Sequence, residues 1–214
     1  MFGIQIRYLS FFFGLVCVLS FFNIIYSYYL NLYLNLDTYY WTFITSLIVS
    51  IVFYKFGGSE KKTNIYNKII TVFLGYILLP LILSIPFYFS IYDLTFLNSF
   101  FESISGFTST GFTIFENIKN IDQSLILWRS STQWIGGLYF LFSIIFLIDI
   151  YDESLKKTLT NFISFNSSEI FKQAVKIFLL YSSLTFLIFV ILNIFSIRSF
   201  DSLNLEFTLI SSGG

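Results

Sequence analysis

The chain has 214 residues, of which 56% are hydrophobic, 22% are aromatic and only 11% are charged. A soluble domain carries about 25% charged residues, so this composition indicates an all-α integral membrane protein. The lack of histidine and the single cysteine exclude histidine-based acid–base catalysis, thiolate metal clusters and internal disulfides, and the zero net charge without basic runs argues against nucleic-acid binding.

Five charge-free runs predict membrane-spanning helices, because about 20 apolar residues cross the hydrocarbon core of a bilayer. The runs are 8–36, 38–54, 69–92, 130–148 and 177–197. The apolar part of the first run is longer than the roughly 7–15 residues of a signal peptide, and no small-residue cleavage site follows it. We therefore interpret the first run as a true span.

Basic residues are unevenly distributed among the expected connections. If the N-terminus is cytoplasmic, nine of the 12 lysines and arginines face the cytoplasm, and only Lys119, Arg129 and Arg198 lie on the other side. The positive-inside rule therefore predicts a cytoplasmic N-terminus, with Lys61 and Lys62 on the inner side. The expected external connections are 31–37 and 112–123, and the expected internal ones are 57–64 and 151–169.

Between the third and fourth runs, residues 94–101 are apolar but too short to cross a membrane, and a segment rich in Gly, Ser and Thr follows at 102–113. This pattern predicts a re-entrant element. A helix over 94–106 would be about 20 Å long. It would end near the middle of the membrane, where non-helical backbone persists only if it lines a watery path or is buried in protein.

The segment after this expected helix has the residue types that coordinate an alkali cation. Glycine permits the dihedral angles that aim carbonyl groups inward, and carbonyl and hydroxyl oxygens replace the hydration shell of the ion. The expected ligands are Thr108, Ser109, Thr110 and Gly111. Alternatively, Gly106 and Gly111 only relieve crowding between packed helices, although their spacing of five differs from the four-residue small-xxx-small pattern. The spacing alone leaves both interpretations open.

The segment Ser105-Gly-Phe-Thr-Ser-Thr-Gly-Phe-Thr113 resembles the first selectivity-filter loop of the Trk/Ktr/HKT superfamily of potassium transporters, and within it the TrkH-type membrane subunits. Residues 100–106 resemble the pore helix of that family. Residues 128–137 resemble the start of the helix after the pore, and Ile85-Pro-Phe87 resembles the end of the helix before it. These motifs occur in the family's order, and the resemblance covers essentially the whole chain.

The resemblance implies four membrane–pore–membrane repeats around one pore in a complete protein, with one key glycine in each filter loop. Residues 1–56 would form two leading transmembrane helices, 65–150 the first repeat, and 167–214 an incomplete second repeat that stops in its filter loop. Aligning the loop ends places Gly214 over Gly111. The second loop would supply Ser211, Ser212, Gly213 and Gly214 as ligands. The chain is thus expected to be a fragment that does not transport alone.

The implied function is potassium uptake through a Trk system in the bacterial cytoplasmic membrane. Potassium is the transported ion, bound by the filter carbonyls of Thr110 and Gly111 among others, and no organic cofactor is expected. The membrane potential would drive entry at about 2.3 kcal/mol per charge per 100 mV. Passive transport and symport with protons or sodium both stay open.

The resemblance also implies partners: membrane lipid, a second copy in a homodimer, and a cytosolic nucleotide-binding regulatory subunit. The competing function is an integral membrane enzyme or a scaffold. An enzyme is disfavoured because the chain lacks histidine and because Glu102 is the only carboxylate well inside a segment of membrane depth in the first repeat.

Other residues have two interpretations each. Glu102 either attracts cations or, as we favour, accepts hydrogen bonds from backbone amides of the filter loop. Asp93 and Asp122 either raise the cation concentration at the external mouth or are ordinary interfacial charges. Arg129, at the expected start of the fourth span, is predicted to snorkel to the interface.

Four further residues are assigned packing or backbone roles. Gly136 and Gly137 are expected to relieve helix packing rather than to contact a ligand. Pro80 and Pro86 are expected to kink or end the third span, because proline lacks the N–H group that a continuous helix needs.

Overall fold

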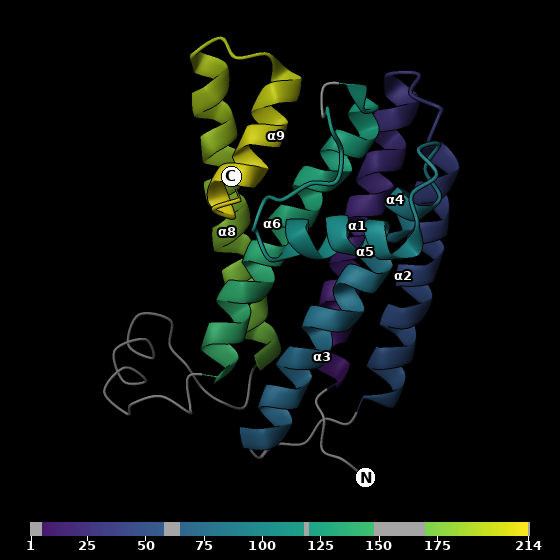
Figure 1. Cartoon of the computed structure of the whole chain (residues 1–214). Helices are drawn as coiled ribbons and strands as arrows, with labels where there is room; N and C mark the ends of the chain where they lie inside the picture. The colour runs from purple at the N-terminus through teal and green to yellow at the C-terminus, as the bar shows by residue number, and fades with distance from the viewer. Residues whose placement is uncertain (1–5, 58–64, 118–119, 148–169, 214) are drawn as a thin grey trace.

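A computed structural model describes residues 6–57, 65–117, 120–147 and 170–213, and every regular element in these ranges is a helix (Figure 1). The helices are α1 (Ile6–Tyr29), α2 (Leu36–Phe56), α3 (Ile65–Leu83), α4 (Ile85–Tyr88), α5 (Phe96–Phe107), α6 (Gln123–Leu147), α8 (Ile170–Ile194) and α9 (Ser199–Ile210). Within the described ranges, five stretches are long and apolar enough to cross a membrane: Arg7–Tyr29, Leu36–Phe56, Ile65–Tyr88, Gln123–Leu147 and Ala174–Ile194. The all-helical class and the five expected spans are thus confirmed.

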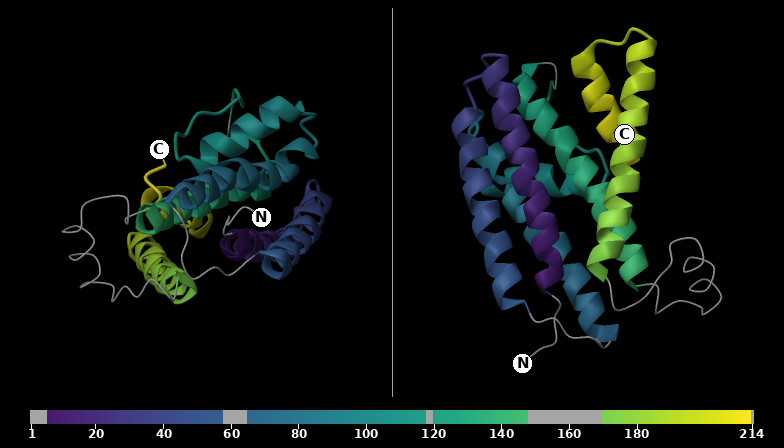
Figure 2. Two further views of the ribbon diagram at one scale, coloured as in Figure 1. Left: turned by 90° about the horizontal axis from the view of Figure 1, so that it is seen from below. Right: turned by 180° about the vertical axis from the view of Figure 1, so that it is seen from behind.

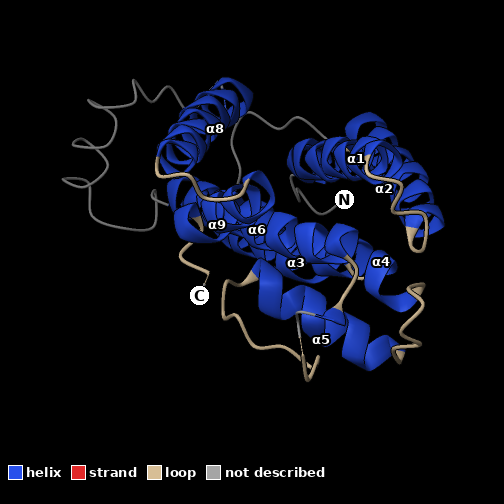
Figure 3. Ribbon diagram, turned by 90° about the horizontal axis from the view of Figure 1, so that it is seen from above, coloured by secondary structure: helices blue, strands red, loops and turns tan. Residues whose placement is uncertain are grey.

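The helices are arranged around α6. The pair α1 and α2 lies along one flank of the molecule, and α8 and α9 lie at the opposite side (Figure 2). Seen from above, α5 lies beside α3 on the side away from α1 and α2 (Figure 3), and it packs against both α3 and α6. Consequently α6 contacts α5 on one side and α8 and α9 on the other.

Aromatic side chains fill the interior between α1, α3, α5 and α6. The ring of Tyr139 on α6 lies 4.8 Å from Phe12, 5.1 Å from Tyr76 and 5.5 Å from Phe107, measured between centroids. Its hydroxyl donates to the carbonyl of Val72 at 2.9 Å, so the buried polar end of the side chain is satisfied. This cluster fixes the end of α5 relative to three longer helices.

A polar cluster attaches the leading pair α1 and α2 to the start of α6. The Nδ2 atom of Asn35 donates to the carboxylate of Asp122 at 3.2 Å, and the Asn35 Oδ1 atom accepts from the backbone amide of Ile91 at 3.1 Å. The hydroxyl of Ser124 also donates to Asp122, and that of Tyr39 donates to Ser124 at 3.0 Å. Asp122 therefore binds neighbouring helices together.

The expected helix boundaries differ most where a charge or a turn was misjudged. α1 ends at Tyr29 rather than at 36, because the chain turns at Asn31, which has a φ of 57°. α6 begins at Gln123 rather than at 130, and it therefore includes Arg129. A charge-free run cannot contain an arginine, so the predicted helix began after Arg129. The helix in the structure contains this arginine, whose charge is paired.

The two prolines act as predicted. α3 ends at Leu83, three residues after Pro80, and the span resumes as α4, whose first turn contains Pro86. The carbonyl of Pro80 accepts hydrogen bonds from the backbone amide of Ser84 at 2.9 Å and from the hydroxyl of Ser103 at 2.7 Å. The Pro80 carbonyl thus links the last turn of α3 to α5.

Candidate functional site

The site is built on α5, which is too short to cross a membrane. Its 12 residues span about 18 Å at 1.5 Å per residue. It begins after Thr95, whose side chain accepts a hydrogen bond from the backbone amide of Asn98 at 3.3 Å. It ends at Phe107, within two residues of the predicted boundary at each end.

The backbone reverses direction directly after α5. The amide of Ser109 donates to the carbonyl of Gly106 at 2.9 Å, and the amide of Thr110 donates to that of Ser105 at 3.1 Å. Ser109 has a φ of 56° and Gly111 a φ of 77°, in the left-handed region that non-glycine residues seldom adopt. The expected ligands Thr108 to Gly111 therefore form one tight turn at the end of the helix.

Hydroxyl groups at the turn bond to the last turn of α5 and to the loop. The Ser105 hydroxyl donates to the carbonyl of Phe112 at 2.6 Å, the Thr108 hydroxyl donates to Ile104 at 2.8 Å, and the Thr110 hydroxyl donates to Ser105 at 3.1 Å. Thr108 and Thr110 are exposed, and Ser109 and Gly111 are half-buried, so one face of the turn is open.

A buried ion pair holds the outer part of this loop. Glu102 is fully buried and contacts the Arg129 Nε atom at 2.6 Å. Its carboxylate also accepts from the hydroxyl of Thr113 and from the backbone amide of Ile114, both at 3.0 Å. Arg129 Nη2 in turn donates to the carbonyl of Gly111 at 3.0 Å. Glu102 and Arg129 together therefore hold the loop at Gly111, Thr113 and Ile114.

This geometry corrects the expectation for Arg129. The side chain does not snorkel to an interface; it is 13% exposed and turned toward α5. The reason is that α6 starts at Gln123, six residues before Arg129, so that Arg129 lies inside the helix opposite Glu102. The carboxylate and the Gly111 carbonyl offset the cost of taking the guanidinium out of water.

A second turn has the same backbone as the first. α5 and α9 both contain 12 residues, and α9 starts 103 residues after α5, the difference between 199 and 96. At this same spacing from Ser109, Ser212 has a φ of 56°, and its amide donates to Leu209 at 3.2 Å. The amide of Gly213 donates to Thr208 at 2.9 Å, as Thr110 does to Ser105. Gly214 lies outside the described residues.

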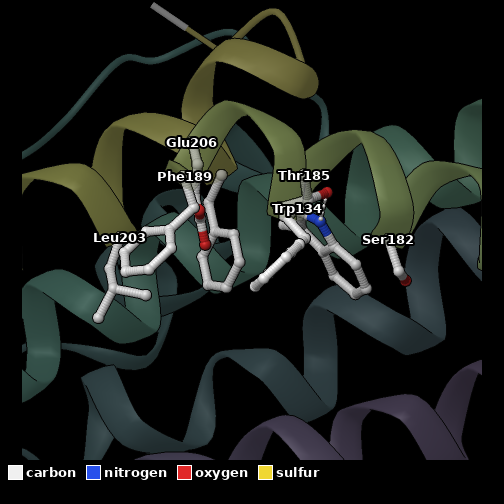
Figure 4. A pocket seen from close by; sticks show the side chains of 8 residues that line it. Trp134, Ser182, Thr185, Phe189, Leu203 and Glu206 are labelled. Carbon is white, nitrogen blue, oxygen red and sulfur yellow. Dashed lines mark hydrogen bonds between the residues drawn. The ribbon is translucent and has the colours of Figure 1, made fainter. Parts of the chain in front are cut away.

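The two turns differ in what holds them. At a spacing of 103 residues, Leu205 occupies the place of Glu102, whereas Glu206 corresponds to Ser103. Glu206 is buried, and its Oε2 atom has no hydrogen-bond partner among the described residues. It lines a pocket of about 310 Å³ between α8, α9 and Trp134, whose Nε1 atom donates to the hydroxyl of Thr185 at 3.0 Å (Figure 4).

Small residues let α6 approach both turns. A Cβ atom at Gly136 would overlap the carbonyl oxygen of Phe107, at the end of α5. One at Gly137 would lie 2.7 Å from the Tyr181 hydroxyl oxygen and 2.9 Å from the Cβ atom of Ser211. The packing role predicted for the two glycines is confirmed. Gly106 also has a packing role, because its Cβ atom would overlap the hydroxyl of Thr132, whereas Gly111 has a conformational one.

The positions of the charged residues in the sequence already indicate this ion pair. Glu102 and Arg129 are opposite charges in two segments near membrane depth, and such charges pair with one another by default. Treating each residue separately assigned Arg129 to the interface.

The chain is similar to known transport proteins. A family model described as TrkH, cation transport protein, matches residues 39–204. The chain is 27% identical over 189 residues to the "Uncharacterized cation transporter MJ1485" of Methanocaldococcus jannaschii, covering 81% of this chain and 38% of that protein. It is 30% identical over 100 residues to the Trk system potassium uptake protein TrkG of Escherichia coli, covering 42% of this chain and 21% of that protein.

The fold also matches a solved structure. The crystal structure of the potassium transporter TrkH from Vibrio parahaemolyticus aligns with a TM-score of 0.76 at 19% identity, over 100% of this chain and 44% of that chain. The chain thus spans less than half the length of these relatives. The family match covers more than half of the chain, and the protein therefore belongs to the TrkH family of cation transport proteins.

Proposed function

We propose that this chain forms part of the ion path of a potassium-uptake transporter. The observation that carries the proposal is the pair of half-length helices α5 and α9, which end in turns of the same backbone and both contact α6. The backbone oxygens of two such turns beside one helix suit the replacement of a hydration shell. The relative in Escherichia coli is named a potassium uptake protein, which supports potassium as the ion.

Backbone carbonyls rather than hydroxyls supply the ligands in this proposal. The hydroxyls of Thr108 and Thr110 donate to carbonyls in the last turn of α5, and these hydrogen bonds hold the turn in shape. The Gly111 carbonyl accepts from Arg129, but a carbonyl oxygen has a second lone pair that is free for a cation. The second turn contributes residues 211–214 in the same way.

The proposed arrangement in the membrane follows the family pattern. Residues 1–56 contain the leading pair, 65–150 form the first repeat with α5 as a re-entrant helix, and 167–214 belong to a second repeat. The N-terminus is cytoplasmic. The working protein is a homodimer in lipid that a cytosolic nucleotide-binding subunit regulates, and potassium is its cargo.

A membrane enzyme or a scaffold is the competing function, and neither needs the two turns. The same left-handed turn closes α1 at Asn31 and α8 at Ser196, so Ser109 and Ser212 differ from these in their place at the ends of two half-length helices. The family to which the chain belongs consists of transport proteins, not enzymes.

The decisive experiment replaces Gly111 in the protein expressed from its full-length gene. Expression of the unaltered gene is expected to restore growth of a potassium-uptake-deficient bacterium at low potassium. Gly111→Ser should weaken the preference for potassium over sodium, because a Cβ atom is strained at a φ of 77°.

Ser109→Ala is the matched control, because it keeps the backbone carbonyl and should change ion preference less. Uptake of potassium and sodium is measured in cells with equal amounts of each protein. Unchanged ion preference in Gly111→Ser, or no transport by the unaltered protein, would count against the proposal.

A further inference from the structure

Two faces of α6 each contact one turn. Thr132 and Gly136 lie against the end of α5, at Gly106 and Phe107 respectively, and Gly137 lies against Ser211 at the end of α9. Residues four apart lie on the same face of a helix. Gln133 therefore shares the face of Gly137, which is directed at the second turn.

Gln133 is fully buried, yet its amide has no hydrogen-bond partner among the described residues. Its exposed fraction is 0%, and neither Oε1 nor Nε2 has a partner there. A Cβ atom at Gly213 would lie 2.9 Å from both the Cδ and the Oε1 atoms of Gln133. The amide is thus in contact with the backbone of the second turn. A buried amide without partners is costly, so its presence there calls for a role.

The acidic residue that anchors the first turn has no equivalent at the same position of the second turn. In the first turn, the charged pair Glu102 and Arg129 binds the loop, but Leu205 stands at the position equivalent to Glu102. A glutamine amide has two donor hydrogens and one acceptor oxygen, so it can bind backbone N–H and C=O groups. Being neutral, it adds no charge next to a cation.

We propose that Gln133 is a positioning residue for the second turn: its side-chain amide packs against the backbone at Gly213 and sets the spacing of that turn from the first. This inference rests on the proposed potassium-uptake function. The amide does for the second turn what the ion pair does for the first. It also explains a glycine at 213, because a larger residue there would displace the amide.

The test uses the full-length protein with Gln133→Met, which keeps the length of the side chain but removes the amide group. We expect the ratio of potassium to sodium uptake to fall by about fivefold to tenfold, because the second turn would lose the group that positions it. Ser131→Ala is the matched control. Ser131 is buried on the same helix and its hydroxyl donates to the carbonyl of Leu127, so this change should leave the ratio unaltered.

A second variant approaches the contact from the other side. Gly213→Ala should lower the same ratio by displacing the amide, and Gln133→Ala combined with it should restore part of the loss, because the two residues are in contact. This variant also decides the matter if Gln133→Met does not accumulate in the membrane.

An unchanged ratio in Gln133→Met or in Gly213→Ala would overturn the inference, as would an equal loss in Ser131→Ala. Each of these results requires that the unaltered protein transports potassium. If the unaltered protein fails to transport potassium, the proposed function itself has failed, so the two failures are distinguishable.

Discussion

At the scale of single residues, the candidate site depends on charges taken out of water in pairs. Glu102 is fully buried, and its carboxylate has an arginine, a hydroxyl and a backbone amide as partners. The sequence predicted that Glu102 would anchor loop amides, and the contact with Ile114 has that geometry. It did not predict Arg129 as the second anchor, because a charge count along the chain carries no information on which helix faces which.

Removing one partner of this pair should harm the protein more than removing both. Arg129→Met leaves the Glu102 carboxylate buried and uncompensated, which costs about 3 kcal/mol or more. The double variant Glu102→Gln with Arg129→Met leaves no unpaired charge and should regain part of the lost thermal stability. Melting temperatures of the purified full-length protein measure both effects.

A surface pair provides the control for this prediction. Arg198 and Asp201 are 3.0 Å apart, and their side chains are 66% and 47% exposed. Arg198→Met should therefore change the melting temperature little, since exposed ion pairs contribute at most about 1 kcal/mol. The two residues would not be coupled if the melting-temperature loss in the double variant equalled the sum of the losses in Glu102→Gln alone and in Arg129→Met alone.

At the scale of helices, most positions could be predicted from the sequence, and their contacts could not. The first half-length helix was expected at 94–106 and lies at Phe96–Phe107, because hydrophobic pattern and turn residues act locally. The start of α6 was misjudged by seven residues because its first turns contain Arg129. The contact of Gly136 with Phe107 joins residues distant in sequence, so only the fold shows it.

The close approach of α5 and α6 should not tolerate a methyl group. Gly136→Ala would place a Cβ atom on the carbonyl oxygen of Phe107, a backbone atom that moves only with the end of α5. We expect lower potassium uptake and lower thermal stability, even though alanine favours a helix over glycine by about 1 kcal/mol.

Gly14→Ala is a suitable control on another helix. Its Cβ atom would lie 3.6 Å from the Ser50 hydroxyl oxygen, an ordinary contact, so this variant should be as stable as the unaltered protein or more so. Equal behaviour of the two variants, with normal uptake in both, would show that the α5–α6 contact is not required.

At the scale of the whole molecule, the described residues combine five membrane-length stretches with two half-length helices. The leading pair α1 and α2 is fixed to α6 through Asn35, Asp122 and Ser124. This role of Asp122 was not predictable from the sequence, because nothing in the order of residues places a loop asparagine beside it. The orientation of the fold in the membrane rests on the distribution of basic residues.

Cysteine labelling in intact cells tests this orientation. Lys61, Lys62 and Lys119 lie outside the described residues. The positive-inside rule assigns Lys61 and Lys62 to the cytoplasmic side and Lys119 to the external side. Lys119→Cys should react with an impermeant thiol reagent added from outside, whereas Lys61→Cys should react only after the cells are opened. The native Cys17 is buried in α1, so the background is expected to be low. Labelling of Lys61→Cys from outside would reverse the proposed orientation.

A single rigid helix serving two turns also limits how the ion path can change. Because α6 contacts the end of α5 on one face and the end of α9 on the other, a displacement of α6 acts on both turns at once. A change that moves this helix therefore alters the packing of both turns. A substitution that alters only one turn must therefore leave α6 in place. Changes in the hydrogen-bond partners within each loop are of this kind. The two turns behave mechanically as one unit.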